Sequence, residues 1–224
     1  GSGKLTLSGS NSFTGETVLE NGSVVVASPD ALSNSSAIDV QSGSTLDLGQ
    51  LENGFTVGSG QELGGTGSIT GGINFADGSI IAPGASPGTL TFDSFVNFNP
   101  NSILNFELNG SDTTVGGGIN DLMTGITDLP LDAVLNVTQF GGDFLADAEF
   151  GDSWVLLEYT GSLIDNGLEL GITPTLGNDL FFSLDTSVEG QVNLQATQAI
   201  PEPTATLLLG LTGLGLAGAR RRKQ

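Results

Sequence analysis

The chain has 224 residues and a formal net charge of −20, from 25 acidic side chains and only five lysines and arginines. It contains no cysteine and no histidine, which excludes a disulfide framework and thiolate metal sites and removes the common hydrolytic triads. Residues 1–199 carry 24 of the acids and a single cation, Lys4, so this part cannot neutralise phosphates and no nucleic acid is expected as a partner.

Glycine accounts for 35 residues, about twice its usual share of ~7%. Together with many Ser, Thr and Asn residues, this composition predicts short strands joined by tight turns. The apolar fraction of 38% is too high for simple disorder. The sequence begins with Gly1, and its opening GSGKLTLSG already has a strand-and-turn pattern, so we expect it to be part of a longer gene product.

Residues 1–110 carry a loose internal repeat, in which a polar turn ending in Gly-Ser is followed by alternating apolar residues. The copies are NGSVVV (21–26), SGSTLDL (42–48), TGSIT (66–70), DGSIIAP (77–83) and the degenerate NSILNFEL (101–108). Three of the four spacings between copies are 21, 24 and 23 residues, and one is 11. A period near 20 residues with short strands is typical of a β-solenoid, although a β-sandwich with evenly spaced hairpins would give similar strand spacing.

One coil of a solenoid cannot bury its own apolar row, so stacked coils must share a continuous interior. The alternation predicts an interior column of Val24, Val26, Leu46, Leu48, Ile69 and Ile80, with Thr45 facing outward. The segment SPDALSNSSA (28–37) is the one candidate for a helical turn ahead of the C-terminal tail.

The stretch GKLTLSGSNSFTGETVLENGSVVVASPDALSNSSAIDVQSGSTLDL resembles the autotransporter-associated (passenger-associated) β-strand repeat. INFADGSIIAPGASPGTLTF (73–92) resembles a segment that often follows such repeats. The resemblance covers about the first 95 residues. It implies a scaffold rather than an activity.

Residues 111–198 are less regular but have the same chemistry. Their strand-like runs are AVLNVTQF (133–140), SWVLLEY (153–159), DLFFSL (179–184) and GQVNLQA (190–196). This part holds the single Trp and the single Tyr, and its aromatic residues suit either the cap that a solenoid needs over its last coil or a separate small β-domain.

The densest acidic group contains Asp143, Asp147, Glu149 and Asp152. Paired carboxylates could serve glycoside hydrolysis, but one Trp and one Tyr offer few platforms for a sugar, and solvated loop acids are the simpler interpretation. Hard cations such as calcium suit these oxygens, but the chain has no EF-hand loop. The Gly-rich GGGIND (116–121) has no lysine with which to hold a phosphate. We therefore predict no catalytic residues, no metal ligands and no cofactor.

The tail has different physical properties. Residues 204–219 carry no charge and would form a helix of roughly 24 Å, short of the ~30 Å hydrocarbon core of a bilayer. Arg220, Arg221, Arg222 and Lys223 follow and would extend its reach by snorkelling. The positive-inside rule then predicts a single-pass helix with the C-terminus in the cytoplasm and the acidic body outside.

Pro201, Glu202 and Pro203 precede the apolar run and keep the chain extended there. The order Pro-Glu-Pro, short apolar helix, Arg cluster resembles the PEP-CTERM sorting signal of exported bacterial proteins. The resemblance implies recognition of Pro201, Glu202 and Pro203 by the membrane processing enzyme exosortase, and delivery to the cell surface or extracellular matrix.

The sequence thus predicts an all-β fold: a right-handed parallel β-solenoid (β-helix) with irregular C-terminal coils or a cap, followed by one transmembrane helix. The predicted parts are residues 1–110 (repeats), 111–198 (continuation or cap) and 199–224 (sorting and anchor segment). The expected function is that of an exported, non-catalytic surface protein, and its expected partners are an exosortase-like enzyme, the lipid bilayer and an extracellular polysaccharide. The alternative is a carbohydrate-binding or carbohydrate-active protein that uses the acids and aromatic residues of 140–185.

Overall fold

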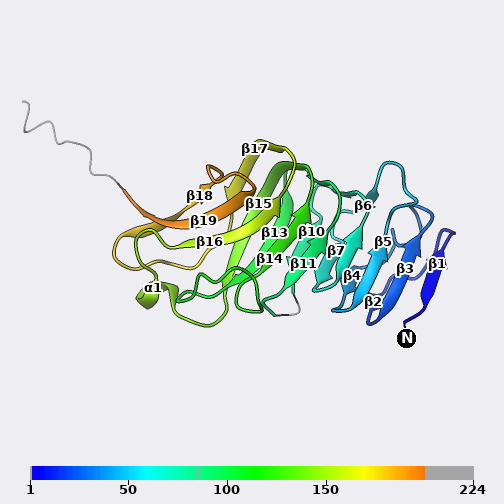
Figure 1. Ribbon diagram of the computed structural model, residues 1–224, viewed down its shortest axis with the longest axis horizontal. Coiled ribbons are helices and arrows are strands. Elements are labelled where there is room, and N and C mark those ends of the chain that lie inside the picture. The colour runs from blue at the N-terminus through cyan, green and yellow to red at the C-terminus, as the bar shows by residue number, and fades with distance from the viewer. Residues whose placement is uncertain (1, 85, 200–224) are drawn as a thin grey trace, which may run out of the picture.

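The computed structural model describes residues 2–84 and 86–199, which form an all-β structure whose strands stack along one long axis (Figure 1). Sheet A has nine strands in the order β1 (Lys4–Leu7), β3 (Gly22–Val26), β5 (Ser44–Asp47), β8 (Ser68–Thr70), β11 (Thr89–Phe92), β14 (Leu122–Ile126), β16 (Ser153–Tyr159), β19 (Gln191–Gln198) and β18 (Leu180–Asp185). Sheet B has seven, in the order β17 (Leu163–Leu170), β15 (Leu129–Gln139), β13 (Ser102–Leu108), β10 (Ile80–Pro83), β7 (Glu62–Gly65), β4 (Ala37–Val40) and β2 (Thr17–Leu19). Sheet C has three: β12 (Val96–Phe98), β9 (Ile73–Phe75) and β6 (Phe55–Val57).

Up to β5 the chain alternates between sheets A and B, and strands of sheet C are added at β6, β9 and β12. Every pairing between two strands of the range β1 to β17 is parallel. This arrangement is consistent with the predicted β-solenoid and differs from a sandwich of hairpins, in which neighbouring strands would be antiparallel. The one helix among the described residues is the four-residue α1 (Phe144–Asp147), which is not long and apolar enough to cross a membrane. The helix predicted at residues 204–219 lies outside the described residues.

The Gly-Ser signature of the repeat forms the turn that precedes a strand. Gly43 and Gly78 have positive φ angles of 80° and 73°, and Asn101, which replaces glycine in the degenerate copy, has a φ of 64°. The next residue in these three copies, Ser44, Ser79 or Ser102, is buried and donates both its N–H and its hydroxyl to the carbonyl oxygen three residues earlier. Glycine and asparagine are the residues that tolerate this left-handed backbone, which explains the pattern seen in the sequence.

The predicted interior column is largely confirmed. Val24, Leu46 and Ile69 lie in register on β3, β5 and β8, and the same alignment continues to Phe92 on β11. Leu46 and Ile69 are fully buried, and Val24, in the second coil, is partly buried against the core. Of the remaining members, Val26 and Leu48 are also fully buried.

The prediction for Ile80 is wrong. On β10 it is Ile81 that is fully buried and aligned with Leu63 and Leu104, whereas Ile80 is half-buried and lies on the alternate face. The copies starting at Gly22, Gly43 and Gly67 belong to sheet A, but those at Gly78 and Asn101 belong to sheet B. The spacing of 11 residues is therefore the distance along the chain from a strand of sheet A to the strand of sheet B in the same coil. The inward apolar residues of the two sheets form separate columns.

Residues 28–37 form turns instead of a helix. Ala31 N–H donates to the Ser28 carbonyl oxygen at 3.0 Å and Ser35 N–H to that of Leu32 at 3.2 Å, while Ala31 and Leu32 are fully buried. The side chain of Gln61 holds this corner, because its amide donates to the carbonyl oxygens of Leu32 and Ser35 at 2.8 and 2.7 Å.

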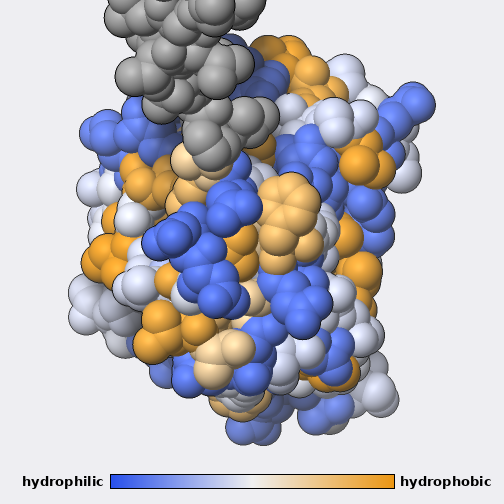
Figure 2. All heavy atoms as spheres, turned by 90° about the vertical axis from the view of Figure 1, so that its left-hand side faces the viewer, coloured by the Kyte–Doolittle hydropathy of each residue, from blue (hydrophilic) through white to orange (hydrophobic). Residues whose placement is uncertain are grey.

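An antiparallel hairpin closes sheet A at the C-terminal end. Strand β19 pairs with both β16 and β18 in antiparallel orientation, in contrast to the parallel stacking before it. The buried rings of Phe144, Trp154 and Phe182 pack together beneath this hairpin, with centroids 5.2–6.1 Å apart. These three aromatic residues thus cover the end of the core, and the outer surface at this end is a mixture of hydrophilic and hydrophobic residues (Figure 2).

Candidate functional site

A groove runs along the outer face of sheet B. It arises because the outward-facing residues of neighbouring strands include two of the smallest side chains, Gly64 on β7 and Ala82 on β10, which lie in register between Asp39 on β4 and Asn105 on β13. Larger side chains stand at either end of this row. The groove is therefore deep over β7 and β10 and becomes shallower toward the neighbouring strands.

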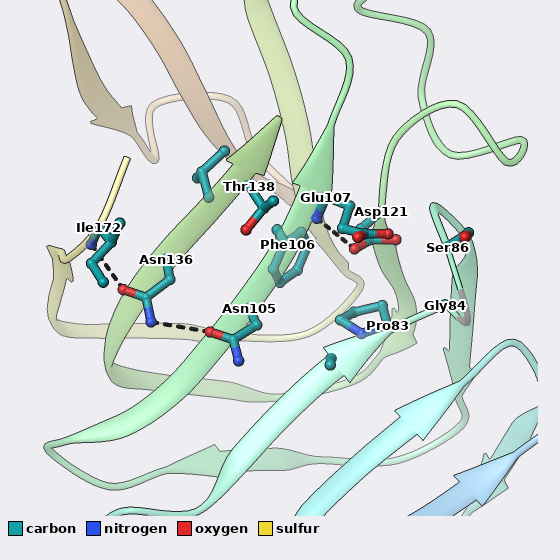
Figure 3. A pocket seen from close by; sticks show the side chains of 12 residues that line it. Pro83, Gly84, Ser86, Asn105, Phe106, Glu107, Asp121, Asn136, Thr138 and Ile172 are labelled. Atoms are coloured by element: carbon teal, nitrogen blue, oxygen red, sulfur yellow. Dashed lines mark hydrogen bonds between the residues drawn. The ribbon is translucent and has the colours of Figure 1, made fainter. Parts of the chain in front are cut away.

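The groove has two connected parts that meet at Gly84. The larger, of about 430 Å³, is lined by Ala82, Pro83, Gly84, Ser86, Asn105, Phe106, Glu107, Asp121, Asn136, Val137, Thr138 and Ile172 (Figure 3). The smaller, of about 210 Å³, is lined by Glu16, Ala37, Ile38, Asp39, Glu62, Gly64, Gly65 and Gly84. We call the two parts together the sheet-B groove.

A ladder of side-chain amides lies along the larger part. Ile172 N–H donates to Asn136 Oδ1 at 2.8 Å, and Asn136 Nδ2 donates to Asn105 Oδ1 at 3.0 Å (Figure 3). Asn105 and Asn136 are register partners on β13 and β15, so parallel stacking places identical amides side by side. The next position in the row is Ala82, whose methyl group cannot accept a hydrogen bond, so the ladder ends at Asn105.

Asp121 and Glu107 lie beside each other on the opposite wall (Figure 3). Asp121 is buried, and its carboxylate accepts from Gly88 N–H at 2.8 Å and Glu107 N–H at 2.6 Å. Burial raises the pKa of Asp121 to about 7, against these two backbone hydrogen bonds, which lower it. Asp121 thereby ties the residue 86–88 loop to β13 and forms a rigid wall.

The neighbouring Asn120 has a structural role. Its Oδ1 accepts from Asn109 N–H at 2.7 Å, and its Nδ2 donates to the carbonyl oxygens of Asp112 and Thr114 at 2.7 and 2.8 Å. The Gly-rich segment 116–121, whose lack of lysine argued against a phosphate site, is thus a loop that brings Asn120 and Asp121 back onto the coil.

The acidic group at 143–152 stabilises turns. Asp143 caps α1 by accepting from Leu145 N–H at 3.0 Å, and Asp147 accepts from Asp143 N–H at 2.9 Å. Asp152 accepts from Glu149 N–H at 2.8 Å. Across residues 2–84 and 86–199, no group of three or more acidic side chains is placed to hold a metal ion.

Trp154 cannot serve as a stacking surface for a sugar, which the alternative function at 140–185 would require. This side chain is fully buried, and its Nε1–H donates to the Asn109 carbonyl oxygen at 2.9 Å. Phe144 and Phe182 are buried beside it. Phe140, Phe150 and Phe181 are exposed, but the single Trp and its two buried neighbours belong to the core and offer no stacking surface to a sugar.

The sorting residues and the basic cluster predicted from the sequence lie outside the described residues: Pro201, Glu202, Pro203, Arg220, Arg221, Arg222 and Lys223. The groove was missed because its residues come from five strands that are far apart in the sequence. The spacing of Asn105 and Asn136 was the available signal, but it can be recognised only once the register of β13 and β15 is known.

Comparison with known proteins gives two family matches, at the two ends of the chain. Residues 1–26 match the Passenger-associated-transport-repeat, and residues 199–223 match the PEP-CTERM protein-sorting motif. Both resemblances noted in the sequence are thereby confirmed. The second match implies an exported protein.

A 122-residue stretch is 38% identical to the adhesin BmaC autotransporter of Brucella suis biovar 1 (strain 1330). The match covers 54% of this chain but 3% of that relative. The chain therefore corresponds to a small part of the adhesin's length.

Proposed function

We propose that the chain is an exported, non-catalytic β-solenoid protein of the cell surface or extracellular matrix, and that its tail is a sorting signal and transient membrane anchor. The observation that carries the proposal is the three-part order of residues 201–203, 204–219 and 220–223, all within the sorting-motif match at 199–223. This segment directly follows β19, which ends at Gln198. The repeat match and the likeness to an adhesin support a surface location.

In this proposal the body is a right-handed solenoid, with repeats at 1–110 and a continuation or cap at 111–198. Residues 204–219 form a transmembrane helix, and the cluster Arg220, Arg221, Arg222 and Lys223 holds the C-terminus in the cytoplasm before processing. An exosortase-like enzyme reads Pro201, Glu202 and Pro203 at the outer surface. A chain without His or Cys, whose acids at 143–152 cap turns, fits a scaffold better than a hydrolase.

The decisive experiment replaces Pro201, Glu202 and Pro203 with alanine in the producing cell and measures the mass of the mature C-terminus. We expect the wild-type chain to lose its basic end and the triple variant to accumulate in the membrane at full length. Deletion of residues 220–223 is the matched control, because it should weaken the orientation of the tail in the membrane and not the recognition of residues 201–203 by the enzyme. Wild-type protein recovered with Gln224 still attached would leave a plain membrane anchor.

Topology can be tested separately with a reporter enzyme that is active only in the cytoplasm. Before processing, we expect activity for a fusion after Gln224 and none for a fusion after Gly190. Activity at both positions would show that the body stays inside the cell.

A further inference from the structure

We propose that the sheet-B groove binds a saccharide chain that carries free amino groups. This inference goes beyond the proposed function and rests on it only in that the body must reach the outside of the cell to meet such a ligand. It moves the sugar-binding surface from the aromatic residues at 140–185 to the outer face of sheet B.

The negative charge of the groove favours a positively charged ligand. Its described lining holds no cation and four carboxylates that are exposed or half-buried, Glu16, Asp39, Glu62 and Glu107, besides the buried Asp121. The one cation of the described chain, Lys4, lies on β1 of sheet A, 3.6 Å from Asp47. Sulfated or uronic-acid polysaccharides would be repelled, whereas an ammonium group would be attracted to the four exposed or half-buried carboxylates.

The hydrogen-bonding groups of the groove suit the hydroxyl groups of a sugar. The Asn136–Asn105 ladder ends in an amide group that lines the groove together with Ala82, and amides can donate where the carboxylates nearby accept. Sugar hydroxyls both donate and accept, so they can bridge the two kinds of group. These side chains come from successive strands of the coil stack, which lie ~4.8 Å apart, so one extended chain can contact several of them along the coil axis.

The position of the groove argues against an extended peptide as the ligand. It lies over β4, β7, β10, β13 and β15, and each of these strands is paired on both sides within sheet B. No sheet edge is therefore open beneath the groove, and a peptide could not add itself as a further strand. The contacts on offer come from side chains on a shallow face, which suits a ligand recognised through its hydroxyl and amino groups.

Binding is tested by calorimetry with the full chain in detergent micelles and a glucosamine hexamer as the probe. The N-acetylglucosamine hexamer has the same length without the charge, and we expect it to bind at least about tenfold more weakly. The variant Ala82→Gln fills the floor and should weaken glucosamine binding by about tenfold or more. Thr91→Gln, on an exposed position of β11 in sheet A, is the matched control and should change nothing.

A second variant keeps the test independent of folding. Glu62 is exposed and lines the smaller part of the groove, so Glu62→Gln should leave the thermal melt unchanged and weaken binding about fivefold. No binding by the wild type, or equal loss in Ala82→Gln and Thr91→Gln, would overturn the proposal. An oligolysine that binds as tightly, with the same dependence on Ala82 and Glu62, would overturn the choice of a saccharide. Because purified protein is used, these outcomes do not depend on whether the tail is processed.

Discussion

The indole N–H of Trp154 donates to the main-chain carbonyl oxygen of Asn109 at 2.9 Å, although the two residues are 45 positions apart. Trp154 lies on β16 under the closing hairpin, and Asn109 directly follows β13. This hydrogen bond joins the cap region to an earlier coil and satisfies a polar atom at the end of the core.

Replacing Trp154 with Phe should therefore lower the free energy of unfolding by roughly 2–4 kcal/mol, because it leaves the Asn109 carbonyl without a donor and opens a small cavity. Urea denaturation followed by far-UV circular dichroism measures the change. Phe150→Ala serves as the control, since this ring is 71% exposed and its loss should matter by less than about 0.5 kcal/mol. Equal effects of the two substitutions would contradict the role assigned to Trp154.

The alternation on β5 predicts opposite outcomes at adjacent positions. Leu46→Asp places an unpaired charge in a fully buried column and should cost about 4 kcal/mol or more, enough to threaten folding. Thr45→Asp lies on the outer face and should be tolerated within roughly 0.5 kcal/mol. Thermal melts of both variants give the comparison. Similar melting temperatures would disprove the strand register.

Gly125 is a position where a side chain has no room. Its φ is +75°, and a Cβ atom there would overlap the carbonyl oxygen of Phe92 on the neighbouring strand. We expect Gly125→Ala to lower the stability by roughly 2–4 kcal/mol, through both the strained backbone and the displaced strand. Gly58→Ala meets no atom within 4 Å and should change the stability by less than about 1 kcal/mol, as chemical denaturation of both variants can establish.

Asp121 should make the protein less stable as the pH rises through neutrality. Its pKa in the folded chain, about 7, lies above the ordinary 3.8, so between these values the folded state holds a proton that the unfolded state has lost. Stability from this group is complete below pH ~4 and is lost as the pH passes 7, by roughly 2–4 kcal/mol. Unfolding measured from pH 4.5 to 8.5 should show this decline.

The variant Asp121→Asn should be less stable than the wild type at pH 5, because its amide NH₂ group faces a backbone N–H donor. The difference should shrink toward pH 8.5, since the variant does not titrate. Hydrogen bonds to Thr114, Ser162 and Ser187 lower the pKa values of Asp112, Asp128 and Asp185, respectively. Stability from those groups is lost only below pH ~4, outside the measured window. A wild-type profile no steeper than that of Asp121→Asn would refute the assignment.

Local signals in the sequence predicted the strands and the turns well. The Gly-Ser pairs marked real turns because only a few residues tolerate the left-handed backbone, and the alternation at Leu46, Leu48 and Ile69 placed the core correctly. It failed at Ile80, because the distance from the turn glycine to the inward residue varies between copies: it is two residues from Gly67 to Ile69 but three from Gly78 to Ile81. Ile81 is inward because it must align with Leu63 and Leu104.

The sequence alone determined the repeating all-β character, the acidic body and the separate chemistry of the tail, because these follow from composition, period and charge. Tertiary structure decided which side chains meet. Stacking in parallel register placed Asn136 against Asn105 and left Gly64 and Ala82 in one row as the floor of a groove. It also brought Asp121 beside Glu107 and buried Trp154 under the closing hairpin. The alternation within a strand indicates which residues share a face, but only the register between coils determines which face is inward and which side chains become neighbours.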